Sequence, residues 1–246
     1  GDNLNVWLST SNKTTSGTEI TAWNDISGDS NNATPKAADK RPLYVSNLQN
    51  NLEGIQIRIV DLSPNKSTPL IISESSTLDM FSTGVSIFVV MKTTALSKAT
   101  TQLVVKKGNS YHLGISSGKV EFYNGSSYGT DGTITFGEDE LILAEIVTDK
   151  DSGSSNHGGI FVNGSLSKDL IGIGPTSDND VNMAIGADLE ANVNTGLEGS
   201  IGEIIVYKGE VTVGQRQQIE GFLCHKWAIT LPSDHPYYSE APTVGD

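Results

Sequence analysis

Apolar and polar residues alternate over short segments through most of the 246-residue chain, and this alternation constrains the fold more than any other feature. In "GIQIRIV", Ile55, Ile57 and Ile59 share one face, while Gln56 and Arg58 share the other. Because successive side chains of a β-strand point to opposite faces, this pattern predicts a half-buried strand. The chain is therefore expected to consist mainly of strands.

Two segments, 85–92 "VSIFVVMK" and 140–147 "ELILAEIV", are more continuously apolar and are expected to be central strands of a two-layer core. Further strands are predicted at "LNVWL", "QLVVKK", "SYHLGI", "KVEFY", "TITF", "GGIFVN", "VNMAIG" and "IGEIIVY". Many short strands at fairly even spacing, with few helices between them, favour an antiparallel sandwich or jelly roll. No internal repeat or linker interrupts residues 1–246, so we expect a single domain.

Two Asn-Gly pairs provide turn signals between these strands. Asn163-Gly164 offers positive φ at both central positions, which predicts a type I′ hairpin between the strands on either side. Asn124-Gly125, which follows "VEFY", makes a similar offer.

The segment "TVGQRQQIEGFLCHKW" is the exception to the strand pattern. It places Ile219, Phe222, Leu223 and Trp227 on one face of a helix, with Thr212 available as its cap. We therefore predict an amphipathic helix over about 212–228 that packs on the sandwich, followed by an extended tail over 229–246. Pro232 and Pro236 in that tail prevent the helix from continuing.

The charge balance excludes several classes of partner. Lys and Arg number 16 against 29 Asp and Glu, a formal net charge of −13 without a basic cluster, which disfavours nucleic acid. An anionic membrane or a polyanionic glycan would be repelled unless a divalent cation bridged the two surfaces. No apolar run approaches the roughly 18 residues of a membrane span, so no membrane insertion is expected.

Two further features bear on processing and redox chemistry. The chain begins at Gly1 without an initiator Met, so a leader, a propeptide or a further domain is expected to have been removed, or the chain is an excerpt. Cys224 is the single cysteine and is expected to be an inert, half-buried filler.

Both ends of the chain carry motifs of a known family. Near the start, "VWLSTSNKTTSGTEITAWNDISGDSNNATPKAADKRPLYV" holds the matching residues Trp7, Trp23, Asp25, Ser27, Gly28, Asn32, Ala33, Thr34, Arg41, Pro42 and Tyr44. Near the end, "GSIGEIIVYKGEVTVGQRQQIEGFLCHKWAITLPSDHPY" supplies a closing strand, a helix and an "H-K-W" to "L-P-x-x-H-P-Y" tail. The chain thus resembles the laminin-G-like, concanavalin A-like jelly-roll domains of bacterial surface proteins and phage virion proteins.

This resemblance implies a fold and a place of action. The fold is an all-β, antiparallel two-sheet jelly-roll sandwich with one C-terminal amphipathic helix, and the location is extracellular, on a cell surface or a virion surface. Ser9 departs from the family, which has Asp after Trp-Leu, and residues 61–135 carry no matching signature. Specificity is therefore expected in that unmatched region and its loops.

The first motif is interpreted as architecture. Trp7 and Trp23 are expected to fill one end of the sandwich. Asp25 can accept backbone N–H bonds across the Ser-Gly turn and Asn32 can do the same further on, while Arg41 is a candidate partner for Asp25. A calcium role and direct ligand contact are the alternatives for this loop.

The same broad fold hosts retaining glycoside hydrolases, whose two catalytic carboxyl groups lie only about 5 Å apart. Glu140 with Glu145, and Glu198 with Glu203, have the outer spacing of that motif but lack its middle carboxylate. Glu145 and Glu203 are therefore predicted to be structural or outward-facing strand carboxylates. No spacing among His112, His157, His225 and His235 fits a zinc site, and the last two are expected to hold the tail by hydrogen bonds.

Calcium and sugar each have candidate residues. The resemblance makes Asp180, Asp188, Glu190 and Asn192, on the loops of "SDNDVNMAIGADLEANVNTG", candidate calcium ligands, because the resembling domains often bind calcium at a sandwich rim. The alternative is that these residues are merely solvating acids. Asp149 and Asp151 are instead expected at a solvated hairpin tip. For a glycan, Tyr128 could stack on the sugar ring while Asn124 and Asp131 take its hydroxyls; the alternative is that Tyr128 covers the core.

Three hypotheses follow for function. The favoured one is a non-catalytic carbohydrate-binding or adhesion module, with or without Ca²⁺, whose partner is a glycan or cell-surface polysaccharide. The alternative is a structural or assembly protein, such as a phage capsid decoration, a tail component or a surface-filament subunit, that meets copies of itself or virion partners. A glycoside hydrolase is the third.

Overall fold

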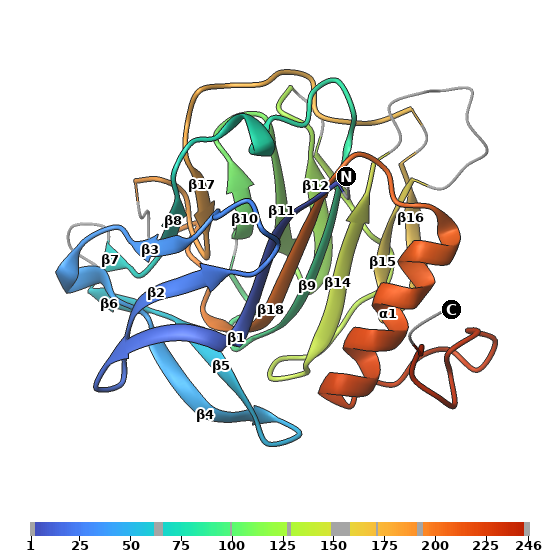
Figure 1. The fold of residues 1–246 in the computed structure, drawn as a ribbon, viewed down its shortest axis with the longest axis horizontal. Helices are drawn as coiled ribbons and strands as arrows, with labels where there is room; N and C mark the ends of the chain where they lie inside the picture. The colour runs from blue at the N-terminus through green and yellow to red at the C-terminus, as the bar shows by residue number, and fades with distance from the viewer. Residues whose placement is uncertain are drawn as a thin grey trace.

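The chain folds into strands with an α-helix near its C-terminus (Figure 1). The computed structural model describes residues 3–61, 66–98, 100–126, 129–148, 158–170, 172–190 and 194–243. The strands are β1 (Leu4–Ser16), β2 (Glu19–Asp25), β3 (Ala33–Pro35), β4 (Leu43–Gln49), β5 (Leu52–Ile57), β6 (Ile59–Asp61), β7 (Lys66–Ser67), β8 (Leu70–Ile72), β9 (Val85–Thr93), β10 (Gln102–Lys107), β11 (Tyr111–Ser116), β12 (Lys119–Tyr123), β13 (Gly129–Asp131), β14 (Ile142–Val147), β15 (Gly159–Val162), β16 (Ser165–Asp169), β17 (Met183–Ile185) and β18 (Gly199–Lys208). The helix α1 spans Val213–Trp227, and short 3₁₀ turns span Ala38–Lys40 and Ser76–Leu78.

The strands form one continuous hydrogen-bonded path, which runs β13-β12-β11-β10-β17-β8-β3-β2-β4-β5-β18-β9-β14-β15-β16, while β6 and β7 pair separately. Strand β1 pairs with both β2 and β18, so β1, β2, β4, β5 and β18 close into a five-stranded, barrel-like ring. The expectation of a mostly β chain with a late helix is confirmed, and the arrangement of the strands is consistent with a β-sandwich. Two separate jelly-roll sheets, in contrast, are not resolved, because the strands form one path and β1 bridges β2 and β18 in its middle.

Two apolar clusters show how the layers are arranged. The larger one lies between the strands β9, β14 and β18 and the strands β10, β11 and β12, and it includes Ile87, Ile204 and Phe122. The smaller one lies between the other face of β9, β14 and β18 and the helix, and it includes Phe88 and Trp227. Figure 1 shows α1 and the C-terminal tail together on the β14 to β16 side of the molecule.

This arrangement explains why two predicted strands are continuously apolar. Alternate residues of β9 and β14 face the sandwich core, while the intervening residues face the helix, so both faces are buried. The prediction that these segments are central strands is therefore confirmed.

The helix begins and ends as its sequence predicts. Thr212 Oγ1 accepts a hydrogen bond from Gln215 N at 3.2 Å, and Gln215 Oε1 accepts one from Thr212 N at 2.9 Å, which completes a capping box. Ala228 ends the helix in the left-handed region at φ 52°. The predicted apolar stripe is wrong at Phe222, which is 39% exposed, because the helix face on the sheet centres on Leu223, Cys224 and Trp227.

Cys224 is fully buried rather than half-buried. Burial, followed by the nearby carboxyls of Glu145 and Glu220, raises the pKa of its thiol far above the ordinary value. The thiol therefore stays protonated, which agrees with the expectation of an inert filler.

The predicted histidine contacts of the tail are confirmed. His225 Nε2 lies 2.7 Å from the carbonyl oxygen of Tyr237, and His235 Nε2 lies 2.9 Å from Glu220 Oε2. The backbone N–H of Tyr237 donates to His235 Nδ1 at 3.1 Å. These bonds hold the tail against α1.

The two Asn-Gly turns differ. Asn163 and Gly164 have φ of 52° and 75°, so both central positions are left-handed and the turn joins β15 to β16 as predicted. At Asn124-Gly125 only Gly125 has a positive φ, 89°. Asn124 instead forms an Asx turn, in which its Oδ1 accepts a hydrogen bond from Ser126 N at 3.2 Å. The predicted strand "TITF" is also absent: residues 133–136 hydrogen-bond as an irregular segment, for instance from Thr133 N to Ser167 Oγ.

No helix among the described residues combines the length and the apolar character that crossing a membrane requires.

Candidate functional site

A hollow of about 400 Å³ opens where three loops meet beside β10 and β17. The turn from β10 to β11 contributes one wall, the segment 177–181 before β17 contributes another, and the segment 188–190 after β17 contributes the third. Its lining residues are Lys106, Gly108, Asn109, Ser177, Asn179, Val181, Asp188, Leu189 and Glu190. Loops on a strand scaffold are a usual place for a binding site.

The lining is chemically mixed. Val181, which is 36% exposed, and Leu189 give apolar surface, and the side chains of Asn109 and Asn179 give two amides. Two carboxylates and an ammonium complete the lining. A surface of this kind can contact the apolar face of a small polar molecule and exchange hydrogen bonds with its hydroxyl groups.

A second ammonium group lies at the edge of the hollow. Lys36 Nζ donates to the carbonyl oxygen of Leu189 and lies 3.8 Å from Glu190 Oε2. On the same segment, Asp188 Oδ2 accepts from Thr195 Oγ1 at 3.3 Å. The segment 188–190 is thereby tied to two other parts of the fold.

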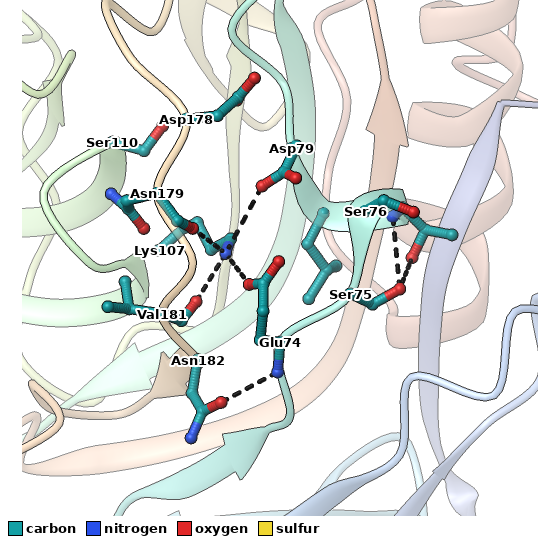
Figure 2. A network of polar contacts seen from close by, with 12 residues as sticks. Glu74, Ser75, Ser76, Asp79, Lys107, Ser110, Asp178, Asn179, Val181 and Asn182 are labelled. Carbon is teal, nitrogen blue, oxygen red and sulfur yellow. Dashed lines mark hydrogen bonds and ion pairs between the residues drawn. The ribbon is translucent and has the colours of Figure 1, made fainter.

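The segment 177–182 is held in place by a buried lysine (Figure 2). Lys107 Nζ donates to the carbonyl oxygens of Asn179 at 2.8 Å and Val181 at 2.5 Å, and it forms ion pairs with Glu74 and with Asp79, the latter at 3.7 Å. Burial raises the pKa of Asp79; Lys107 opposes that effect, and Glu74 adds to it. We refer to Lys107 with Glu74, Asp79 and the carbonyls of Asn179 and Val181 as the Lys107 cage.

Further bonds fix the same segment. Asp178 Oδ1 accepts from Phe81 N at 2.7 Å, and Asn182 Oδ1 accepts from Glu74 N at 2.9 Å. With its amide turned so that the oxygen faces the β10–β11 turn, Asn179 accepts from Asn109 N at 3.2 Å. The hollow is thus formed before any ligand binds, which lowers the entropic cost of binding.

Beside the hollow, the outer face of the sheet carries a row of three side chains, Lys106, His112 and Tyr123, which we call the outer row. They are paired in register across β10, β11 and β12, and the rings of His112 and Tyr123 stack with centroids 5.0 Å apart. Because Lys106 also lines the hollow, the row extends the candidate site along the sheet.

Carboxylates flank the outer row. Glu121 Oε1 lies 3.0 Å from His112 Nε2, and Glu121 Oε2 accepts from Thr101 Oγ1 at 2.8 Å. Burial acts to raise the pKa of Glu121, but the contacts with His112 and Thr101 outweigh it and lower that pKa. Asp131 lies opposite Glu121 in the register, and burial together with the Glu121 charge raises the pKa of Asp131.

The structure separates the residues predicted to bind sugar. Asp131 lies on the edge strand β13 beside Glu121, whereas Asn124 follows the far end of β12. Asn124 is only 8% exposed, and its side-chain oxygen accepts from Ser126 Oγ at 2.9 Å, so it holds a turn. Tyr128 lies outside the described residues.

The predicted calcium ligands are partly gathered. Asp188 and Glu190 line the hollow, and Asp180 lies exposed in the segment 177–182, while Asn192 lies outside the described residues, as do Asp149 and Asp151. Within the part of the chain that the structure describes, no three His, Cys, Asp or Glu side chains are grouped so as to hold a metal ion. Calcium binding at these residues stays a prediction.

Two of the four carboxylates considered for hydrolysis, Glu145 and Glu203, are buried. Glu203 is fully buried and accepts hydrogen bonds from the indole nitrogens of Trp7 at 2.8 Å and Trp227 at 2.9 Å, and from Lys226 Nζ at 2.6 Å. Glu145 is also fully buried and accepts from Gly164 N at 3.1 Å. Both are structural, as expected, and the alternative that they face outward is wrong, because α1 covers this side of the sheet.

The first motif is architectural in this structure. Asp25 accepts from the backbone N–H groups of Trp7 at 2.8 Å, Ser27 at 3.0 Å and Asn31 at 2.9 Å. Asn32 Oδ1 in turn accepts from Asp25 N at 2.8 Å. The predicted roles of Asp25 and Asn32 are therefore confirmed.

Two details of that motif are corrected. Arg41 pairs with Glu19 at 3.1 Å and not with Asp25, because β4 begins beside Glu19. Trp23 is buried in the sandwich core, whereas Trp7 packs against the helix-side cluster, so the two rings do not fill the same end.

Comparison with known proteins supports the fold. No protein-family profile and no curated protein sequence matches the chain. Among solved structures, the binding domain of Paraclostridial Mosquitocidal Protein 1 superposes with a TM-score of 0.64 at 12% identity, over 89% of this chain and 52% of that one. Domain 4 of an extracellular arabinanase from Geobacillus stearothermophilus, in complex with arabinotriose, gives 0.59 at 13% identity, over 86% of this chain and 95% of that one.

A botulinum neurotoxin type C structure, whose description states that cell entry depends on two ganglioside molecules, gives 0.60 at 11% identity over 88% of this chain and 50% of that one. This chain thus spans about half the length of the two toxin chains. At such low identity these similarities establish a shared β-rich fold and no more.

Proposed function

We propose that this protein is a non-catalytic carbohydrate-binding module, a laminin-G-like or concanavalin A-like jelly roll displayed on a cell or virion surface. The observation that carries the proposal is the preformed hollow, which combines apolar surface with amide, carboxylate and ammonium groups and continues into the stacked rings of the outer row. Sugars present apolar ring faces and a set of hydroxyl groups, which such a lining complements.

The charge of the protein narrows the glycan. With a formal net charge of −13, the surface repels polyanionic glycans at long range. Lys36 and Lys106 beside the hollow can donate hydrogen bonds to hydroxyl oxygens, but two ammonium groups do not reverse the negative electrostatic field of the whole protein. A neutral oligosaccharide is therefore the proposed ligand class.

The structural neighbours support this proposal by analogy. An arabinanase domain was solved with arabinotriose, and a neurotoxin of similar fold is described as interacting with gangliosides. The analogy supports only the idea that this fold is used to bind ligands. The location of the site must be tested in this chain itself.

Calcium is part of the proposal as an auxiliary ligand. Asp188 and Glu190 at the hollow, with Asp180 on the adjoining segment, would supply the oxygen donors that Ca²⁺ prefers, and Asn192, which lies outside the described residues, is the fourth candidate ligand. Calorimetric titration with glycan in Ca²⁺ and in a chelator tests this part separately. An unchanged affinity and no heat of Ca²⁺ binding would remove calcium from the proposal.

An array of neutral oligosaccharides that includes arabino-oligosaccharides, followed by calorimetry on the hits, tests the main proposal. Asp188→Asn and Tyr123→Ala should weaken binding at least about tenfold, since each removes a polar or stacking contact worth about 1–3 kcal/mol. The matched controls Asp234→Asn and Tyr238→Ala, on the tail, should stay within about twofold. Absence of binding at millimolar glycan, or equal loss in the controls, would reject the proposal.

The alternative is a structural subunit that assembles with copies of itself, and one observation favours it. An apolar groove of about 310 Å³ lies between α1 and the paired strands β1 and β18, and its lining includes Trp7, Tyr207, Ile219 and the exposed Phe222. Light scattering with the intact protein and with Phe222→Ser distinguishes the two functions. A concentration-dependent oligomer that Phe222→Ser dissociates would favour assembly, and a monomer at all concentrations would exclude it.

A further inference from the structure

The Lys107 cage has the composition of a metal site with an ammonium group at its centre. Lys107 ends β10 and is fully buried. Its Nζ is surrounded by four oxygens: a carboxylate oxygen each from Glu74 and Asp79, and the carbonyl oxygens of Asn179 and Val181. Figure 2 shows these groups converging on the nitrogen from two segments, 74–79 and 177–182.

The donor set is the one that hard cations take in proteins. Ca²⁺ is bound by carboxylate and backbone carbonyl oxygens, commonly from loops that would otherwise be independent of one another. Here the two carboxylates come from the segment 74–79, and the two carbonyls come from the segment 177–182. A cation at the centre therefore joins two loops that are about 100 residues apart. The hydrogen bond from Glu74 N to Asn182 Oδ1 links the same two segments independently of the cation.

We propose that the Lys107 ammonium serves as the protein's own substitute for a structural metal ion, so that the two loops are ordered without any bound cation there. The cage is by the same argument a latent divalent-cation site, which is filled internally as long as Lys107 is present. This proposal does not rest on glycan binding.

The cost of burying a charge favours a structural role for the Lys107 ammonium over burial by chance. A buried ammonium loses its hydration and is tolerated only where charges and hydrogen bonds replace the lost water, and this one has two carboxylates and two carbonyls. Because the cation is covalently attached, it is present at every calcium concentration and needs no separate binding step. Lys107 has no exposed surface, which also excludes contact with a substrate and makes it a positioning residue.

The consequence reaches the hollow. Asn179 and Val181, whose carbonyl oxygens Lys107 holds, both line it. The ammonium thus sets the position of one wall, while the outward-facing neighbour Lys106 lies in the lining itself.

The test compares wild type with Lys107→Ala, which removes the ammonium and leaves room for an ion. In a chelator, the Tm of Lys107→Ala should fall by about 10 °C, since the two carboxylates are left without a cation. Addition of about 5 mM CaCl2 should restore at least half of that loss, and calorimetry should find one more Ca²⁺ bound than in wild type. Mg²⁺ should restore less, because it demands a stricter octahedral geometry.

Three control proteins make the result specific. Lys107→Met fills the cage with an apolar chain and should bind no additional Ca²⁺, and Lys107→Ala combined with Glu74→Gln should lose the additional site. Lys168→Ala, at an exposed position of β16, should change neither the Tm nor the Ca²⁺ stoichiometry. If Lys107→Ala does not fold in the chelator, refolding from urea with Ca²⁺ or with Mg²⁺ decides the question in the same way.

Two outcomes would overturn the proposal. One is that Lys107→Ala binds no additional Ca²⁺ and is not restored by it during either heating or refolding. The other is that Lys107→Met or the Glu74 double variant is restored equally, since the gain would then come from elsewhere on the acidic surface. Because the readouts are a Tm and a stoichiometry, a failure here is distinct from a failure to bind glycan.

Discussion

Glu145 offers the sharpest test of how the helix is held against the sheet. Its carboxyl group is fully buried between β14 and α1, accepts from Gly164 N at 3.1 Å and lies near Glu220. Burial, followed by the charge of Glu220, raises the pKa of Glu145 well above its ordinary value of 4.5. The folded protein therefore keeps a proton that the unfolded chain releases.

The sign and the size of the effect follow from that difference. A raised folded-state pKa gives a stabilising contribution that is complete below pH 4.5 and is lost as the pH rises toward the folded pKa. Within this window, each pH unit lowers the free energy of unfolding by about 1.4 kcal/mol. Glu145→Gln keeps an acceptor for Gly164 N–H and does not titrate, so its stability relative to wild type should rise as the pH increases above 4.5, with a slope of up to about 1.4 kcal/mol per pH unit until the folded-state pKa is reached.

Urea unfolding followed by tryptophan fluorescence at pH 5, 6, 7 and 8 measures this difference, because Trp227 is buried at the end of α1. Glu140→Gln is the matched control: Glu140 is exposed near the start of the same segment, and its substitution should shift stability by no more than about 0.5 kcal/mol at any pH. A difference between Glu145→Gln and wild type that stays flat from pH 5 to pH 7 would refute the reasoning.

Three other substitutions test separate contacts. Glu203→Gln should destabilise the protein by about 2–4 kcal/mol in urea unfolding at pH 7, because two indole N–H groups and an ammonium lose a charged acceptor; a neutral effect would contradict that role. Asp25→Ala should cost about 2–4 kcal/mol in the same assay, since three backbone N–H groups lose their acceptor, and a cost below about 1 kcal/mol would mean that water replaces it. Thr212→Ala should lower stability by about 1 kcal/mol while Thr212→Ser should not, and equal losses would argue against the capping box.

Local signals in the sequence were sufficient for most of the secondary structure. The alternation at Ile55 and Ile57 marks the inward face of β5, and the unbroken apolar run of β9 marks a strand buried on both faces. The helix cap at Thr212 was also predictable, because a capping box is defined by residues three apart. These features depend on neighbours in the chain, which the sequence lists in order.

The candidate site depends instead on which strands and loops meet. Lys106, His112 and Tyr123 form a row only because β10, β11 and β12 pair in one register, and a shift by one residue would place them on opposite faces. Lys107 contacts Asn179 and Val181, which follow it in the chain by 72 and 74 positions, and such distant contacts leave no local signature in the sequence. The signal in the sequence was the pair Lys106-Lys107 at the end of "QLVVKK". Because side chains of a strand alternate between its two faces, one of two successive lysines must point inward.

Each buried charged residue of this fold lies where one segment attaches to another, a placement that apolar packing alone does not explain. Lys107 joins two loops to the end of β10, Glu203 joins β18 to the end of α1, and Glu220 joins α1 to the tail through His235. Apolar side chains tolerate small shifts of one element on another, whereas an ion or indole partner left unpaired inside the protein costs several kcal/mol. Each attached segment is therefore held at one position on a β core that is itself apolar. The proposed glycan site depends on that property at the Lys107 cage, because the walls of the hollow must keep their spacing while the strands beneath them supply the stability.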